Sequence, residues 1–199
     1  MNIPWTDYRT RSVEPTVATG DLFAFGGKSA VASVVQGLCG GPVDHVAPVL
    51  RTRAQDELFV VWIIEAVIPE VRAVPLRHRL AAYDGDVWWL PLGPDQQKRC
   101  DYRRMTAYML GSIGRRYDVW QAARVGLHLP NTECEEAYFC SELAGFIYEA
   151  GGLLSHKINP SNTDPVEICK WGLWGADYHY VQGNDPRELP GFNTVPVGR

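Results

Sequence analysis

The chain has 199 residues, of which 46% are hydrophobic, 21% charged and 11% aromatic, and its formal net charge is -4. This length and composition indicate one globular domain, residues 1–199, with a core of its own. The negative net charge and the scattered arginines argue against a nucleic-acid partner, because phosphate binding needs a cluster of basic side chains.

The N-terminus and the cysteines indicate in which cellular compartment the protein is expected. No basic stretch followed by an apolar run opens the chain, so we expect no signal peptide, and no window is long enough for a membrane span. The cysteines are odd in number and irregularly spaced, which is typical neither of a disulfide framework nor of a zinc site. We expect reduced thiols in the cytoplasm and no metal or cofactor, with release by lysis or carriage on a particle left open. The cysteines are Cys39, Cys100, Cys134, Cys140 and Cys169.

The first half of the chain predicts a run of strands with one helix among them. Apolar residues from Val31 to Leu38 recur at helical spacing and predict a helix across 28–41 that stops at two glycines. Apolar runs bounded by turn residues predict the strands, which fall at residues 20–25, 44–50, 58–68, 71–76 and 86–92.

The second half predicts helices. A stripe through Met105 and Met109 predicts a helix over 95–113, and the other helices are expected at 118–127, 137–152 and 165–171. The end of the chain is rich in Pro and Gly and is interpreted as a surface tail over 170–199, which leaves a core of about 19–165. A run of strands flanked by helices favours an α+β fold.

The helix expected after Phe139 opens on a cysteine. Its apolar face runs from Leu143 to Ala150, and Cys140 lies one turn before Leu143. At a helix start the unpaired backbone N–H groups and the helix dipole favour a thiolate, and the same N–H groups can hold an oxyanion beside the sulfur. Cys140 is therefore a candidate nucleophile. The alternative is a small core residue at a helix end.

A cysteine nucleophile needs a base and a group that orients the base. Glu65 lies inside the apolar run 58–68, where an unpartnered carboxylate would cost on the order of several kcal/mol, so it should have a partner. If 44–50 and 58–68 form a hairpin centred on Gln55, His45 and Glu65 face each other, with Cβ atoms about 5 Å apart. Glu65 can then accept one imidazole N–H and leave the other nitrogen for a thiol. A core or edge histidine is the alternative, because a slip of one residue separates the pair.

Other motifs compete with this constellation. G-G-K-S at 26–29 resembles the end of a phosphate-binding loop, but Leu22 stands where that loop needs a glycine. His156 is an alternative base in an expected loop without a partner carboxylate, and Cys134 is expected to be an ordinary thiol. Ser141 lacks the G-x-S-x-G elbow of serine hydrolases.

Five short motifs follow one another between about residues 19 and 165: G-D-L-F-A-F, D-H-V-A-P-V-L, W-I-I-E-A, G-R-R-Y-D and Y-F-C-S-E-L-A-G. Their order resembles the circularly permuted branch of the papain-like NlpC superfamily, above all the YiiX/YaeF-like group, with lecithin:retinol acyltransferases more distant. In that branch the histidine precedes the cysteine, and the nucleophile opens a helix in a Tyr-x-Cys-Ser-Glu type motif. The resemblance implies a permuted papain-like fold in which an antiparallel sheet packs against helices.

The resemblance also implies roles for the matching residues. Cys140 would be the nucleophile, His45 the general base and acid, and Glu65 the residue that orients the imidazole. Tyr117, in G-R-R-Y-D, matches a tyrosine beside the nucleophile that contacts substrate or helps to hold the oxyanion. The other matching residues, Asp118, Ser141 and Glu142, are interpreted as structural. Relatives often carry an export signal and a glycine or aliphatic residue in place of Pro48, and this chain departs from both patterns.

The implied activity is that of a cysteine hydrolase of the amidase or thiol-protease type, which uses a Cys-His-Glu catalytic triad and forms an acyl-enzyme. The expected partner is a peptide or acylated-amine substrate, such as a cell-wall peptide. A lipid-directed acyltransferase or thiol esterase is a second reading, and a non-catalytic structural or binding component of a larger assembly is a third. An open polar groove beside Cys140 would favour the hydrolase, and a deep apolar tunnel would favour the lipid-directed enzyme.

Overall fold

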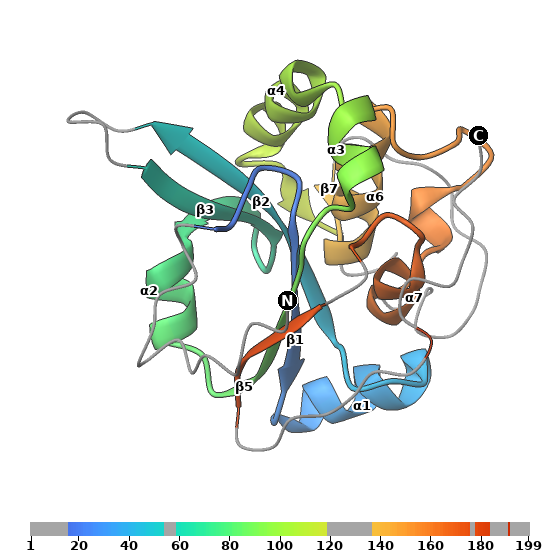
Figure 1. Ribbon diagram of the computed structural model, residues 1–199. Helices are drawn as coiled ribbons and strands as arrows, with labels where there is room; N and C mark the ends of the chain where they lie inside the picture. The colour runs from blue at the N-terminus through green and yellow to red at the C-terminus, as the bar shows by residue number, and fades with distance from the viewer. Residues whose placement is uncertain (1–15, 54–58, 119–136, 176–177, 184–190, 192–199) are drawn as a thin grey trace.

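Six strands form one antiparallel sheet in the computed structural model, which describes residues 16–53, 59–118, 137–175, 178–183 and 191 (Figure 1). The strands are β1 (Leu22–Gly27), β2 (His45–Arg53), β3 (Phe59–Ala66), β4 (Val71–Pro75), β5 (Gly85–Leu90) and β8 (His179–Gln182). Their order across the sheet is β4-β3-β2-β1-β5-β8, and each neighbouring pair is antiparallel. With the helices described below, this sheet confirms the α+β class.

The predicted strands are all present, and the sixth strand corrects one expectation. Residues 170–199 were expected to form a surface tail, but β8 lies within them and pairs with β5. The ring of Tyr180 packs on that of Trp88 at a centroid distance of 5.7 Å, and Trp171 is buried. The strand has only four residues among Pro and Gly, too few for a periodic signal. The described part of this segment therefore belongs to the core and to the sheet edge.

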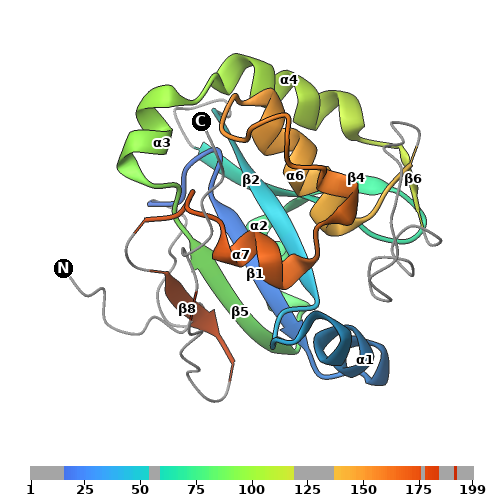
Figure 2. The same cartoon turned by 90° about the vertical axis from the view of Figure 1, so that its right-hand side faces the viewer.

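Helices cover both faces of the sheet, as Figures 1 and 2 show. One face packs against α4 (Tyr102–Ser112), α6 (Cys140–Ala150) and α7 (Pro165–Lys170), and the other packs against α2 (Leu76–Ala81). Because side chains alternate along a strand, Leu22 and Ala24 of β1 face the first group, while Phe23 and Phe25 face α2. Burial on both sides explains why these strands are continuous apolar runs rather than alternating ones.

The predicted helix at 95–113 is wrong as a single element. It is divided into α3 (Pro94–Arg99) and α4, because Cys100 has an extended backbone and the Asp101 carboxylate accepts the Arg104 N–H at 3.0 Å to begin a new helix. The helix α2 was not expected, because its six residues directly follow β4 and its first residue, Leu76, was assigned to that strand. The helix predicted at 118–127 falls outside the described residues from 119 onward.

The helix α1 (Ala30–Cys39) is present as predicted, yet its apolar stripe faces solvent. The Ser29 hydroxyl caps its start by accepting the Ala32 N–H at 3.1 Å. Val31 is 74% exposed and Val34 61% exposed, and within the helix only Ala32 is buried. Helical spacing thus predicted the element but not the direction in which its apolar face points. Among the described helices, none has the length and apolar character needed to cross a bilayer.

The packing of α6 gives a stability prediction. A Cβ on Gly145 would lie 2.5 Å from the Cβ of Pro160, so Gly145→Ala should destabilise the protein by about 1–3 kcal/mol through overpacking. Gly111 in α4 is the matched control, because a Cβ there meets nothing within 4 Å. Gly111→Ala should stabilise by about 0.5–1 kcal/mol, since alanine favours a helix. Denaturant unfolding measures both changes, and equal effects at the two positions would contradict this packing.

Candidate active site

Cys140 is the first residue of α6 and lies at a helix start that no side chain caps. The preceding residue, Phe139, has an extended backbone and makes no side-chain cap. The first-turn N–H groups of a helix have no partner within the helix, and the positive end of the helix dipole therefore lies at the cysteine. The cysteine is 7% exposed and joins the core cluster between α6 and the sheet. The predicted position of the cysteine is therefore confirmed.

The two residues after the cysteine anchor this end of the helix. The Ser141 hydroxyl donates to the carbonyl oxygen of Thr163 at 2.6 Å, and the Ser161 hydroxyl donates to the carboxylate of Glu142. Ser161 belongs to the 3-10 helix η2 (Pro160–Asn162), and Ser141, Glu142 and Ser161 are fully buried. Their role is thus more specific than the sequence indicated, because they tie the start of α6 to the η2 segment.

His45 connects the cysteine to a buried carboxylate. Its Nε2 lies 3.0 Å from Oε2 of Glu65, and its ring is close enough to Cys140 for the sulfur to favour the imidazolium. With Nε2 bound to Glu65, Nδ1 is the ring nitrogen left for the sulfur. The imidazole packs on Phe25 at a centroid distance of 5.6 Å, and 14% of the side chain is exposed. The three residues that the sequence placed in a triad therefore lie in one contiguous chain of contacts.

The strand register that was used to pair His45 with Glu65 is wrong by two residues. Val49 lies opposite Ile63, and extending that register places Glu65 opposite Ala47 rather than His45. A shift of two keeps both side chains on one face, because the side-chain period of a strand is two. The contact is therefore diagonal and depends on the reach of the two side chains.

Two arginines complete the surroundings of Glu65, and the sequence analysis did not find them. Arg72 donates two hydrogen bonds to Oε1 at 2.9 and 2.7 Å, and Arg79 donates one to Oε2 at 3.0 Å. Arg72 lies directly opposite Glu65 in the β3–β4 pairing, so a correct register for that hairpin would have revealed it. Arg79 comes from α2, and no local sequence signal places it there.

These contacts keep Glu65 ionised although its side chain is fully buried. Burial raises the pKa of the carboxyl, but the hydrogen bond and charge of His45 and the nearby guanidinium groups outweigh it and hold the pKa well below its usual range. A carboxylate with a lowered pKa stays charged at any pH at which the imidazole titrates. Glu65 can therefore fix the tautomer and orientation of His45.

The pKa of His45 is raised to about 9. Burial alone would lower it, but the hydrogen bonds and charges of Cys140 and Glu65 favour the imidazolium and dominate. The imidazole is therefore protonated at neutral pH and places a positive charge near Cys140.

Tyr117 is placed near the start of α6 by a short two-stranded sheet. It belongs to β6 (Arg116–Tyr117), which pairs in parallel with β7 (Ala137–Tyr138), the strand directly before α6. Burial and the charges of Cys140 and Asp118 raise the pKa of the Tyr117 hydroxyl, so it stays protonated and can donate a hydrogen bond. The backbone N–H of Asp118 donates to the carbonyl oxygen of Tyr138, which fits the structural role expected of it.

The alternative residues are not positioned for this chemistry. His156 is 91% exposed and pairs with Glu149 near the C-terminal end of α6, away from the cysteine at its start. The segment that contains Cys134 lies outside the described residues. Cys39, at the end of α1, was not a candidate from the sequence. The charges of Asp164, Cys140 and Asp44 add to burial in raising the pKa of its thiol.

The fold is similar to that of a solved structure of another protein. No family model matches the chain, and no curated protein matches it. The structure of YiiX from Escherichia coli O157:H7, described as a metalloprotein, aligns with a TM-score of 0.50 and 16% identity over 71% of this chain and 68% of that one. At this identity the likeness concerns the fold alone.

A metal centre does not fit the residues described here. Within the described ranges, no group of three or more His, Cys, Asp and Glu side chains is arranged to hold a metal ion. Both oxygens of Glu65 are bound by guanidinium groups, which place positive charge where a cation would have to approach.

The buried ion cluster gives a second stability prediction. Glu65→Gln removes the charge that pairs with Arg72, Arg79 and His45, so it should destabilise the protein by about 3–5 kcal/mol. The control is Asp95→Asn, which removes an exposed pair with Lys98 and should cost about 0–1 kcal/mol. Thermal and denaturant unfolding compare the two, and a loss below 1 kcal/mol for Glu65→Gln would contradict the cluster.

The imidazole titration gives a third prediction. NMR should show His45 titrating near pH 9, with a lower midpoint in both Cys140→Ala and Glu65→Gln, because each variant removes a group that favours the imidazolium. A raised folded-state pKa means that His45 stabilises the fold fully below about pH 6.5, its unfolded value, and that this contribution is lost as pH rises through about 9. A midpoint that stays near the unfolded value in all three proteins would show that the contact does not form.

Proposed function

We propose that the protein is a cysteine hydrolase of the amidase or peptidase type, with a permuted papain-like fold and Cys140, His45 and Glu65 as its triad. The observation that carries the proposal is the position of His45, which is hydrogen-bonded to Glu65 and interacts with Cys140 at the first residue of α6. The likeness of the fold to YiiX and the order of histidine before cysteine in the chain support the permuted architecture.

The chemistry follows from these contacts. The Cys140 thiolate attacks the carbonyl carbon of an amide, and the C–N bond breaks as His45 gives its Nδ1 proton to the leaving amine. A water molecule then attacks the thioester, His45 accepts its proton, and the acid leaves as the thiolate is restored. The N–H groups at the start of α6 lie where they can hold the oxyanion of each step, and Tyr117 is a further donor beside the sulfur.

Glu65 and its arginines act through the histidine. The carboxylate holds Nε2 of His45 so that Nδ1 faces the sulfur, and the two guanidinium groups share its negative charge. We expect Glu65 and both arginines to be positioning residues, because their atoms are engaged with one another rather than with the reacting sulfur.

One observation favours a second candidate, an acyltransferase or thiol esterase that acts on an acyl chain. The apolar stripe of α1, with Val31 and Val34 exposed, ends at Cys39, whose thiol lies within electrostatic range of Cys140. An acyl chain could lie along this stripe and place its carbonyl at the sulfur. The two candidates share the acyl-enzyme and differ in what the acyl group is attached to.

Selective labelling tests the proposed nucleophile. Burial raises the pKa of Cys39 to about 12 and of Cys100 to about 11, and it raises that of Cys169 further, so these thiols should react slowly at pH 6. Iodoacetamide at pH 6, read by peptide mass spectrometry, should modify Cys140 first. His45→Ala should slow that labelling by roughly 10²-fold, the scale of an acid–base partner.

The controls use the other thiols. Cys100→Ala should leave the labelling of Cys140 unchanged, and Cys134→Ala removes the one thiol outside the described residues. Incubation with a peptide amide and with a fatty-acyl thioester then separates the two candidates by which one leaves an acyl group on Cys140. Equal labelling of all thiols, with no dependence on His45, would contradict both.

A further inference from the structure

A cavity of about 390 Å³ lies outside the catalytic residues, between the end of β1, the start of α1 and the turn that leads from α2 to β5. Three of its lining residues, Gly27, Lys28 and Ser29, belong to the G-G-K-S segment, which lacks a glycine that a phosphate-binding loop needs. It is more than ten times the volume of about 30 Å³ that one water occupies in the liquid, so it has room for a small organic group. The lining residues are Gly27, Lys28, Ser29, Ala32, Asp44, Tyr83 and Asp84.

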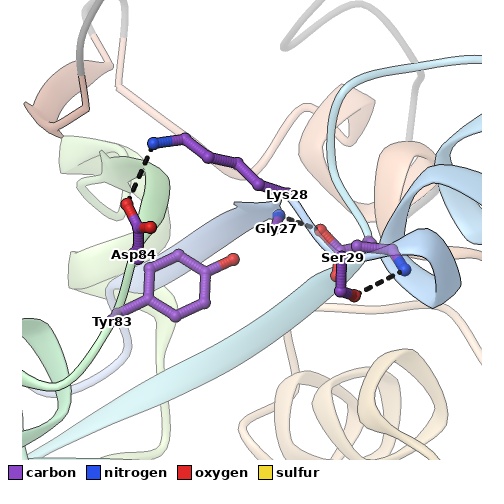
Figure 3. A pocket seen from close by; sticks show the side chains of 7 residues that line it. Gly27, Lys28, Ser29, Tyr83 and Asp84 are labelled. Carbon is purple, nitrogen blue, oxygen red and sulfur yellow. Dashed lines mark hydrogen bonds and ion pairs between the residues drawn. The ribbon is translucent and has the colours of Figure 1, made fainter.

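Two polar atoms converge above Gly27. A Cβ on this residue would lie 2.9 Å from the Cβ of Ala32, 3.3 Å from Oδ2 of Asp44 and 3.4 Å from the hydroxyl oxygen of Tyr83, so only glycine lets these two polar atoms approach the backbone here. Figure 3 shows the Tyr83 hydroxyl pointing toward Gly27 and Ser29. The carboxylate and the hydroxyl therefore face the same point from different elements.

Neither of these atoms has its hydrogen bonds completed by the described residues. Oδ1 of Asp44 accepts the Gly27 N–H at 2.5 Å and the Gln36 amide at 3.2 Å, but Oδ2 has no hydrogen-bond partner there. The hydroxyl of Tyr83 is buried and likewise has no hydrogen-bond partner. Buried polar atoms in native proteins are almost always hydrogen-bonded, so a ligand or solvent should satisfy the Tyr83 hydroxyl, and the half-buried Oδ2 of Asp44 is the acceptor beside it.

The phenol ring is held rigidly. Phe25 packs edge-on against Tyr83 at a centroid distance of 5.1 Å, and the guanidinium of Arg79 lies 4.7 Å from the ring centroid. The hydroxyl is thus fixed in place rather than free to turn to solvent. Phe25 also touches His45, so the cavity and the catalytic histidine share one aromatic wall.

The charges around the cavity favour a cation over an anion. The ammonium of Lys28 is paired with Asp84 at 2.9 Å, and the carboxylate of Asp44 already accepts the N–H of Gly27 ahead of α1. Burial raises the pKa of the Tyr83 hydroxyl, and the charges of Asp44, Asp86 and Asp84 add to that effect against Arg79. The three carboxylates oppose negative charge at this hydroxyl, so they also disfavour a bound phosphate.

We propose that this cavity binds a primary ammonium group, as found at a peptide amino terminus, in an amino sugar or in a diamine. An ammonium presents three N–H donors. The cavity offers Oδ2 of Asp44, the hydroxyl oxygen of Tyr83 and the second lone pair of the Ser29 hydroxyl, which already accepts the Ala32 N–H. The ion pair of Lys28 and Asp84 lies at its rim. This binding site does not depend on the proposed hydrolase activity.

Binding is measured on the full chain by NMR, with Cys140→Ala as the host so that no turnover occurs. L-Alaninamide should shift the amide signals of Gly27 and Lys28 in a saturable way, while N-acetyl-L-alaninamide and tetramethylammonium should not, because neither carries an ammonium N–H. Tyr83→Phe and Asp44→Asn should each weaken binding at least fivefold. The control Asp95→Asn, at an exposed site outside the cavity, should leave it unchanged.

Several results would overturn the proposal of an ammonium site. Equal binding of the acetylated or quaternary compound would show that no N–H is recognised, and binding of inorganic phosphate in place of L-alaninamide would show an anion site. Failure of L-alaninamide to bind, or equal binding by Tyr83→Phe, would also overturn the proposal. Because Tyr83→Phe removes only the hydroxyl, it decides the question even if Asp44→Asn does not fold. Iodoacetamide labelling of Cys140 is unaffected by any of these outcomes.

Discussion

A single fully buried carboxylate, that of Glu65, organises the candidate site. It receives hydrogen bonds from Arg72 on β4 and Arg79 on α2 and contacts His45 on β2, so it joins two neighbouring strands to the helix that covers this face of the sheet. A charge placed there without partners would be costly, and the surroundings therefore have to supply them together. His45 is one of these partners, so the need to pair Glu65 also positions the imidazole.

The cysteine is positioned independently, from the other side of the sheet. Ser141 and Glu142 tie the start of α6 to the η2 segment, and the core between α6 and the sheet fixes the direction of the helix. The two halves of the site thus depend on different interactions and meet only at the contact of Cys140 with His45. Such an arrangement orients the nucleophile and its base through separate sets of contacts.

Short-range patterns in the sequence predicted the elements, and they predicted the candidate residues where the helical or strand period alone determines which face a residue lies on. Cys140 follows from the helical stripe that begins at Leu143, and His45 and Glu65 share a face because a register error of two residues preserves the face.

Contacts between distant elements were not predictable in this way. Arg79 comes from a six-residue helix with no sequence signal, and the break between α3 and α4 depends on a cap at Asp101 inside an otherwise continuous helical pattern. Likewise, the period of α1 does not tell whether its stripe packs on the sheet or faces solvent.

The central claim is that the sulfur of residue 140 and the imidazole of residue 45 touch in the folded protein. A crystal structure of the unmodified, reduced protein at pH 7 measures this directly. The account predicts hydrogen-bonding contact between Sγ and Nδ1, with Nε2 on the Glu65 carboxylate. A water molecule or another side chain between the sulfur and the ring, or a histidine turned away from the start of α6, would contradict it.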